Sequence, residues 1–209
     1  MTDDAPQSLT QTLTLTEGAR IPLLGFGTWQ LTGDDAVRAT SSALESGYRH
    51  LDTATVYGNE AEVGRALADS GVPREDVFLT TKCLPSHSGR ELDTLRESLE
   101  LLHTDHVDLW LIHWPGAGSV NTDMWRAFIE ARDAGLAREI GVSNFDASLI
   151  DEVTKATGVT PAVRSSGAPS SSPLRCWRST VVVASRSRAT APSGAEPSST
   201  RPSWRSRSA

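Results

Sequence analysis

With 209 residues, the chain is long enough for one sizeable domain, and its formal charge of −6 is distributed unevenly along it. Residues 1–163 contain 12 basic and 25 acidic side chains, whereas residues 164–209 contain eight arginines and a single acid, Glu196. Two cysteines, Cys83 and Cys176, are too few for a disulfide framework. No apolar run approaches the roughly 20 residues of a membrane span, and nothing near Met1 resembles a signal peptide. We therefore expect a cytoplasmic protein without membrane partners.

The predicted elements begin with a short β-hairpin and continue as five units, each a strand followed by a helix. Apolar residues alternate with Thr and Gln over residues 9–15, and a turn at Glu17-Gly18 precedes the return at Arg20-Ile21. Apolar runs and amphipathic segments then alternate, with Asp34 as the expected N-cap of the first helix. The predicted strands cover residues 23–29, 50–55, 77–83, 107–113 and 137–143, and the predicted helices cover residues 34–46, 60–70, 89–102, 122–134 and 147–157.

The spacing of the strands predicts a parallel sheet. Their ends near Asp52, Lys82, His113 and Ser143 are 30, 31 and 30 residues apart, the length of a βα unit with its loops. Consecutive right-handed units can close into an eight-stranded barrel or stay open as a doubly wound sheet. The first βα turn, residues 25–29, lacks the third glycine of a dinucleotide fingerprint, which favours the barrel. A complete barrel needs about 250 residues, so five units are only part of one.

Polar residues lie at the carboxyl ends of the predicted strands, where barrel enzymes place their active sites. These positions carry Asp52, Tyr57, Lys82, His113 and the pair Ser143-Asn144. Tyrosine has a pKa near 10 and is a poor acid at pH 7, but a neighbouring cation lowers that pKa, and a carboxylate can hold the cation in place. Such a group is suited to protonating a carbonyl as hydride arrives.

Four segments carry a resemblance to a known family. Residues 47–60, 80–83, 111–115 and 141–145 resemble four signatures of the aldo-keto reductases, in the family's order and spacing. The similarity covers residues 13–163 and is greatest to the bacterial branch that includes 2,5-diketo-gluconate reductases. It implies an α/β fold, the (β/α)8 TIM barrel, of which this chain carries about five βα units. It also implies a monomeric, NADPH-dependent oxidoreductase that reduces small aldehydes, ketones or keto-sugars.

The resemblance assigns catalytic roles to matching positions. Tyr57 is expected to be the general acid, with Lys82 and Asp52 as the pair that tunes it. His113 is expected to orient the substrate carbonyl. No metal site is expected, because His103 and His106 have a ligand-like spacing but no cysteine or carboxylate cluster joins them.

The resemblance also assigns binding roles. NADPH or NADP+ is expected to contact Gly27, Thr28, Asp52, Ser143 and Asn144, the last two through the nicotinamide carboxamide. The substrate pocket is expected to be walled by Trp29, Tyr57, His113 and Trp114.

Each of these residues also has an ordinary structural interpretation when it is taken alone. Lys82 is then a solvated charge at a strand end, Asp52 a helix cap or turn residue, and His113 a satisfied core histidine. Tyr57-Gly58-Asn59 is then simply a turn. It is the joint register of the four segments that favours a common active site.

The family pattern stops after Val163. The family has a sixth strand there, typically Asn-Gln-Val-Glu-Trp-Ser-Pro, whereas residues 164–169 read Arg-Ser-Ser-Gly-Ala-Pro. The codons CAG GTC GAG TGG AGC CCC spell Gln-Val-Glu-Trp-Ser-Pro in frame and the observed residues when read one base late. Residues 189–196 are likewise a one-base-late reading of Gly-Tyr-Ser-Pro-Leu-Gly-Arg-Gly. We therefore hypothesise a frameshift, genuine or from sequencing, near codon 163.

On this hypothesis, residues 1–163 are a partial barrel and residues 164–209 are an out-of-frame, disordered tail rich in Ser, Arg and Pro. Three strands are lost, together with the late loop that holds the adenosine 2′-phosphate in the family. One alternative is that the chain is an inactive fragment that acts at most as an interaction module. Another is an arginine-serine arm that binds nucleic acid, which we disfavour because only Trp177 and Trp204 could stack on bases.

Overall fold

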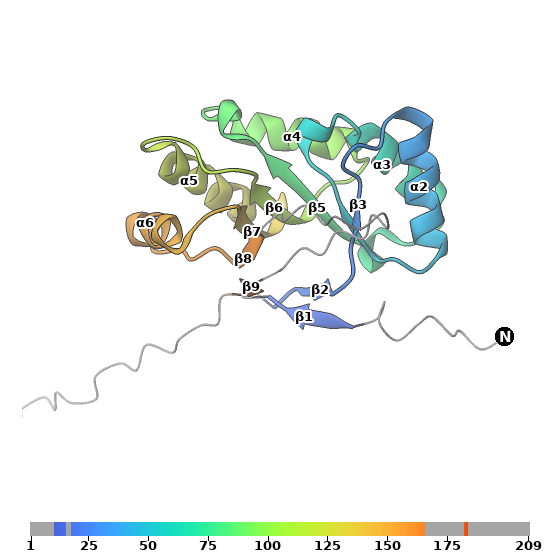
Figure 1. The fold of residues 1–209 in the computed structure, drawn as a ribbon, viewed down its shortest axis with the longest axis horizontal. Helices are drawn as coiled ribbons and strands as arrows, with labels where there is room; N and C mark the ends of the chain where they lie inside the picture. The colour runs from blue at the N-terminus through green and yellow to red at the C-terminus, as the bar shows by residue number, and fades with distance from the viewer. Residues whose placement is uncertain (1–10, 16–17, 166–181, 184–209) are drawn as a thin grey trace, which may run out of the picture.

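The computed structural model describes residues 11–15, 18–165 and 182–183, and its centre is a sheet whose outer side is lined by helices (Figure 1). The strand order is β3-β4-β5-β6-β7-β8-β9, and every pair from β3 to β8 is parallel. The strands are β3 Phe26–Gly27, β4 His50–Asp52, β5 Phe78–Cys83, β6 Val107–Ile112, β7 Ala137–Ser143, β8 Val163–Ser165 and β9 Val182–Val183. All five predicted strands are therefore confirmed as neighbours in chain order.

The five predicted helices are also confirmed. They are α2 Gly33–Glu45, α3 Glu60–Asp69, α4 Glu91–Leu101, α5 Val120–Asp133 and α6 Ala147–Thr157. The predicted N-cap of the first helix is wrong, because Thr32 occupies that position. Asp34 lies in the first turn, where its negative charge interacts favourably with the positive end of the helix dipole. Three short 3-10 helices, η1 Thr55–Tyr57, η2 Arg74–Asp76 and η3 Pro85–His87, were not predicted.

The predicted hairpin forms an antiparallel pair, β1 Thr12–Thr14 with β2 Arg20–Pro22. It lies at one end of the parallel sheet (Figure 1). Leu15 and Ile21 pack against the sheet, in a cluster of buried side chains that includes Phe78, Leu109 and Leu111. The hairpin thus covers the side chains on the face of the sheet that points away from the helices.

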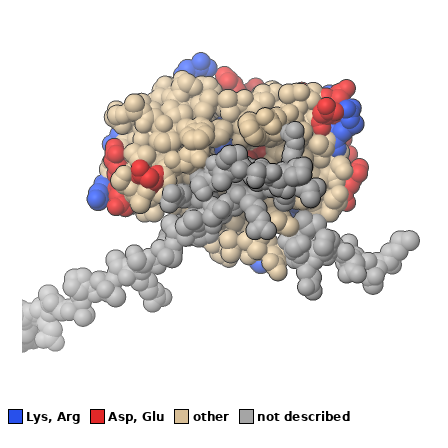
Figure 2. Space-filling view, viewed as in Figure 1, with Lys and Arg blue, Asp and Glu red and all other residues tan. Residues whose placement is uncertain are grey.

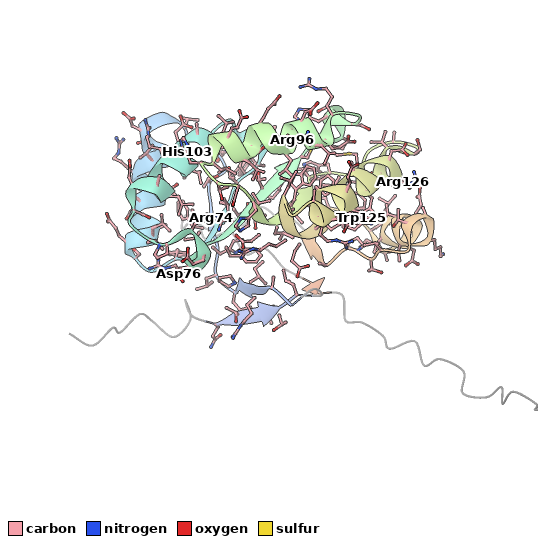
Figure 3. All side chains as sticks on the ribbon, turned by 180° about the vertical axis from the view of Figure 1, so that it is seen from behind. Arg74, Asp76, Arg96, His103, Trp125 and Arg126 are labelled. Carbon is pink, nitrogen blue, oxygen red and sulfur yellow. The ribbon has the colours of Figure 1, made fainter. Side chains whose placement is uncertain are left out.

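A larger apolar cluster fills the layer between the sheet and the helices. Because successive side chains of a strand point to opposite faces, Trp110 and Ile112 enter this layer while Leu109 and Leu111 face the other way. Trp110 stacks on Phe128 of α5, with ring centroids 3.6 Å apart. The helices present their charged residues outward, as Arg96 and Arg126 show in Figure 3, and on the face drawn in Figure 2 the charged side chains gather along the outer margins.

Strand β8 crosses the boundary predicted between the barrel and the tail. Arg164 and Ser165 pair in parallel with Val142 and Ser143, so the sheet continues two residues past position 163. Strand β9 then pairs antiparallel with β8, so residues 182–183 of the predicted disordered tail form a strand. The rest of that tail, residues 166–181 and 184–209, lies outside the described residues.

The part of the chain that the structure describes has neither a membrane-spanning helix nor a cluster of metal-binding side chains. No helix there is both long and apolar enough to cross a membrane. No group of three or more His, Cys, Asp or Glu side chains is gathered there in a way that could hold a metal ion.

Candidate active site

The carboxyl ends of β4, β5 and β6 bring Asp52, Lys82 and His113 together. Register explains this, because β5 lies between the other two strands and Lys82 pairs across the sheet with Leu111. All three side chains are buried, and Lys82 has no exposed surface. The sequence prediction that these residues share one site is therefore consistent with their positions.

The ammonium of Lys82 is held by two neighbours on β4 and its following loop. It donates to Asp52 Oδ1 at 2.5 Å and to the carbonyl oxygen of Thr53 at 2.8 Å. Its Nζ also lies 3.5 Å from the hydroxyl oxygen of Tyr57. A buried ammonium needs such partners because desolvation of an unpaired charge is costly. The pair therefore fixes a cation next to the phenol.

Tyr57 reaches this position through η1. The Thr55 hydroxyl donates to the carbonyl of Lys82 at 3.0 Å, which ties the turn to β5, and Gly58 ends it with a left-handed φ of 63°. The Tyr57 ring packs edge-on against His113, with centroids 5.7 Å apart. The ammonium of Lys82 thus contacts both the Asp52 carboxylate and the Tyr57 phenol, and the phenol in turn contacts the His113 imidazole.

The pKa of Tyr57 is raised, whereas the sequence predicted that it would be lowered. Burial raises the pKa above its usual value; the charge of Lys82 opposes that change, and the charge of Asp52 adds to it. The lowered pKa expected from the neighbouring cation is therefore wrong, because desolvation of the ring outweighs the charge of Lys82. At neutral pH the phenol is therefore protonated, and the charge of Lys82 offsets part of the cost of ionising it.

His113 is neutral at pH 7. Burial and the charge of Lys82 lower its pKa, the charge of Asp52 opposes them, and the resulting pKa is about 4. A neutral imidazole can donate one hydrogen bond without giving up its proton. Among the described residues, no group hydrogen-bonds to its buried Nδ1. The ring can therefore orient a polar group through a hydrogen bond, but it is a poor acid because it carries no extra proton to transfer.

Ser143 and Asn144 lie next to His113, at the end of β7. Asn144 has a left-handed φ of 62°, and its Nδ2 donates to the carbonyl of His113 at 3.0 Å and to Ser143 Oγ at 3.1 Å. Asparagine tolerates this conformation better than most residues. The Asn144 side chain is therefore held in place by the backbone of His113 and by the Ser143 hydroxyl.

Two exposed tryptophans flank the site. Trp114 is 52% exposed and stacks beside His113 at 6.3 Å, and Trp29 is 57% exposed on the turn after β3. Thr28, which precedes Trp29, is buried and donates through both its N–H and its hydroxyl to the carbonyl of Asp52. The predicted pocket residues Trp29 and Trp114 thus lie on the loops that follow β3 and β6.

Comparison with known proteins decides the family. Residues 23–167 match the Aldo/keto reductase family profile. The chain belongs to the aldo/keto reductase family. An aldo-keto reductase of Mycolicibacterium smegmatis is 46% identical over 154 residues, which are 72% of this chain and 56% of that protein. This chain therefore spans just over half the length of such a relative.

Solved structures agree with this membership. A putative 2,5-diketo-D-gluconic acid reductase B has a TM-score of 0.72 at 41% identity and covers 78% of this chain and 58% of its own. A Bombyx mori aldo-keto reductase in complex with NADP has a TM-score of 0.71 at 34% identity and covers 76% and 58%. The parallel sheet with its outer helices is thus the first part of the family's TIM barrel.

The chain's residues fit the nicotinamide end of the aldo/keto reductase cofactor. A carboxamide both donates and accepts hydrogen bonds. Ser143 and Asn144 offer a hydroxyl and an amide that are hydrogen-bonded to each other. The backbone of Gly27 and Thr28 lies next to Asp52, because Gly27 pairs with it in the sheet and the N–H of Thr28 donates to its carbonyl.

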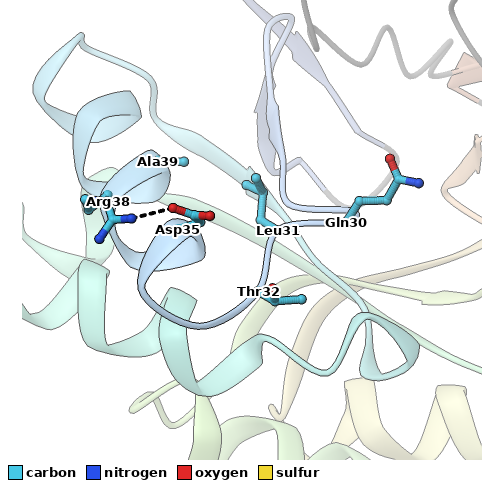
Figure 4. A pocket seen from close by; sticks show the side chains of 6 residues that line it. All are labelled: Gln30, Leu31, Thr32, Asp35, Arg38 and Ala39. Carbon is cyan, nitrogen blue, oxygen red and sulfur yellow. Dashed lines mark hydrogen bonds and ion pairs between the residues drawn. The ribbon is translucent and has the colours of Figure 1, made fainter.

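Sequence reasoning missed several residues that shape this aldo/keto reductase site. Thr53 supplies a carbonyl to Lys82, Thr55 anchors the Tyr57 turn, and Asn59 bonds the turn that carries Trp29. All three lie inside the 47–60 signature, so an excess of small polar residues around Tyr57 was the available indication. A pocket lies where the same turn meets α2 (Figure 4); its lining residues are Gln30, Leu31, Thr32, Asp35, Arg38 and Ala39.

Proposed function

We propose that this chain carries the catalytic half of an NADPH-dependent carbonyl reductase in which Tyr57 is the general acid. The observation that carries the proposal is the buried Lys82–Asp52 pair, whose ammonium lies 3.5 Å from the Tyr57 hydroxyl, beside a neutral His113. A cation placed against a phenol that is otherwise hard to ionise favours proton release to a substrate oxygen.

The residues act in sequence on the carbonyl oxygen. The His113 N–H donates to that oxygen and fixes its direction. Tyr57 then transfers its hydroxyl proton to the oxygen as negative charge develops there. The phenolate that remains is stabilised by the Lys82 ammonium, which Asp52 and the Thr53 carbonyl hold in place. After release of the alcohol, Tyr57 regains a proton from solvent.

NADPH would supply the hydride when bound. Ser143 and Asn144 would hold its carboxamide, while Gly27, Thr28 and Asp52 would line the nicotinamide. The support is their placement around His113 and Tyr57, together with the NADP complex of the Bombyx mori relative.

The substrate would be a small aldehyde, ketone or keto-sugar. Trp29 and Trp114 offer exposed apolar surface, whereas Tyr57 and His113 offer polar groups, so a compact molecule with one carbonyl suits the site. The similarity to a putative 2,5-diketo-D-gluconic acid reductase supports the keto-sugar class. We further propose that the protein acts as a cytoplasmic monomer.

The test is a panel of carbonyl compounds with the purified 209-residue chain. Oxidation of NADPH should be followed at fixed cofactor concentration, with cofactor binding measured separately by fluorescence. Substrate-dependent oxidation supports the proposal. NADPH binding without turnover of any aldehyde, ketone or keto-sugar contradicts it for this chain.

A second proposal concerns residues 164–209. The family match stops at residue 167, and the chain covers only 56% of the Mycolicibacterium smegmatis relative, which favours the frameshift and a fragment limited to binding other molecules. The underlying nucleotide sequence tests it. Restoring one base near codon 163 should open a continuous frame through strands six to eight, and early stop codons in that frame would refute it.

A further inference from the structure

Asn59 occupies a helix cap without using its side chain as a cap. It is the N-cap residue of α3, yet its side chain accepts no hydrogen bond from the helix. Asp146, the N-cap of α6, does accept such a bond, from the N–H of Leu149. Asparagine is favoured at N-caps because it can make that local bond. The amide of Asn59 is therefore used for something else.

That amide makes three hydrogen bonds outside its own helix. Its Nδ2 donates to the carbonyls of Thr28 and Leu31 at 2.8 and 2.9 Å. Its Oδ1 accepts from the hydroxyl of Thr53 at 2.9 Å, and it lies 3.4 Å from the hydroxyl of Thr28, whose single proton faces the carbonyl of Asp52. Asn59 has no exposed surface. Both N–H groups and the oxygen of the amide are thus used.

The two carbonyls that Asn59 holds are the first and last of a tight turn. The N–H of Leu31 donates to the carbonyl of Thr28 at 3.1 Å and closes residues 28–31. Gln30, the third residue, has a left-handed φ of 65°, a position that favours glycine and is strained for glutamine. Trp29 is the second residue and projects half-exposed from the turn. Figure 4 shows this turn where it leads into α2, with Gln30 pointing away from Thr32.

The same amide connects the turn to the buried ion pair. Thr53 donates its hydroxyl to Asn59, while its carbonyl accepts from Lys82. Thr28 accepts from the Asn59 amide through its carbonyl and donates through its N–H to the carbonyl of Asp52. We propose that Asn59 is a positioning residue that holds the Trp29 turn in a fixed place relative to the Asp52–Lys82 pair. What that position serves rests on the proposed function, but the positioning itself can be measured without turnover.

Hydrogen exchange of the full chain tests this role through Asn59→Asp. Aspartate keeps the shape and the acceptor oxygen but replaces the two donors that face carbonyls. The amides of residues 28–32 should exchange about tenfold faster, the size expected when one or two buried hydrogen bonds are lost. Residues 115–121 should be unchanged.

Asn121→Asp is the matched control. Asn121, in the first turn of α5, is also buried, but its amide bonds the N–H and the carbonyl of Gly116 in the loop that precedes its own helix. It should loosen residues 115–121 and leave residues 28–32 unchanged. Equal loss of protection everywhere in Asn59→Asp, or none at residues 28–32, overturns the proposal.

Tryptophan fluorescence supplies a readout that a purely structural role would not move. Asn59→Asp should make more of the emission open to acrylamide quenching, and the change should vanish in a Trp29→Phe background. If Asn59→Asp does not fold, Thr53→Val removes one bond to the same amide and should give a smaller change in the same segment; no change there overturns the proposal.

The two proposals can fail separately. Faster exchange at residues 28–32 without NADPH binding supports the role of Asn59 and contradicts the proposed function. NADPH binding and turnover with unchanged exchange in Asn59→Asp contradict the role of Asn59 alone.

Discussion

The two ends of the parallel sheet each contain a buried carboxylate paired with cations, and they use it differently. At the amino ends, Asp108 accepts from Arg74, from Arg138 and from the N–H of Leu79. Both of its oxygens are engaged, and Arg74 also donates to the hydroxyl of Thr104 and to the carbonyls of Val77 and His106. At the carboxyl ends, Asp52 holds Lys82, whose ammonium also faces the hydroxyl of Tyr57. A saturated pair stabilises the fold, whereas a pair that keeps its cation against a phenol can serve chemistry.

Removing the cation from the carboxyl end should have the largest effect. Lys82→Met leaves Asp52 buried without its partner, and loss of one member of a buried pair typically costs about 3–5 kcal/mol. We expect a large drop in the free energy of unfolding, measured by urea denaturation, and loss of any NADPH oxidation.

The double variant Asp52→Asn with Lys82→Met sharpens this result. Removing both charges should restore much of the stability without restoring turnover. A double variant as unstable as Lys82→Met would show that the pair is not the source of the loss.

Breaking the pair at the amino end should cost stability only. Asp108→Asn keeps the shape of the side chain but removes the charge that Arg74 and Arg138 share, at a cost of about 1–3 kcal/mol. NADPH affinity and turnover of the folded protein should not change. An altered Michaelis constant in Asp108→Asn would contradict the division of labour between the two ends.

The neutral state of His113 should make stability depend on pH. Its pKa is about 4 in the folded protein and near 6.5 in the unfolded chain, so below pH 6.5 the unfolded state binds more protons. Folding stability should therefore fall as pH decreases from 6.5 to 4, by up to about 1.4 kcal/mol per pH unit. Burial also lowers the pKa of His50, and burial raises the pKa of Glu60, which acts in the opposite direction.

The comparison of wild type with His113→Asn isolates the contribution of this ring. Denaturation should be measured at several pH values in both proteins, and the difference in slope belongs to His113. Identical slopes would mean that the imidazole is not held neutral by burial.

Exposed pairs on the outer helices should contribute least. Arg96 pairs with Asp93 at 3.1 Å, and Arg126 pairs with Asp123 at 2.9 Å, all largely exposed to solvent. Arg96→Ala or Arg126→Ala should change the unfolding free energy by less than about 0.5 kcal/mol and leave NADPH binding unaffected. A loss as large as that of Asp108→Asn would remove the distinction between buried and surface pairs.

The sequence predicted much of the fold because hydrophobic periodicity is a local property. Every helix from α2 to α6 and every strand from β3 to β7 follows from apolar runs and 3.6-residue spacing. Strand ends also predicted which polar residues would meet, since parallel strands bring their carboxyl ends to one edge.

What could not be predicted depends on packing. The raised pKa of Tyr57 follows from the burial of its ring, which no spacing reveals. Asn59 occupies an ordinary helix-cap position in the sequence, and the three bonds that its side chain makes to other segments depend on the folded chain. The cap at Thr32 rather than Asp34 is a smaller difference of the same kind, because both residues suit the start of α2.

The central claim is that Tyr57 donates the proton, and Tyr57→Phe tests it most directly. The variant loses one hydroxyl and keeps the ring that packs against His113. NADPH-dependent reduction should fall by about a hundredfold or more, while NADPH affinity changes little, because general acid catalysis contributes at least that factor. Undiminished reduction by Tyr57→Phe would contradict the account.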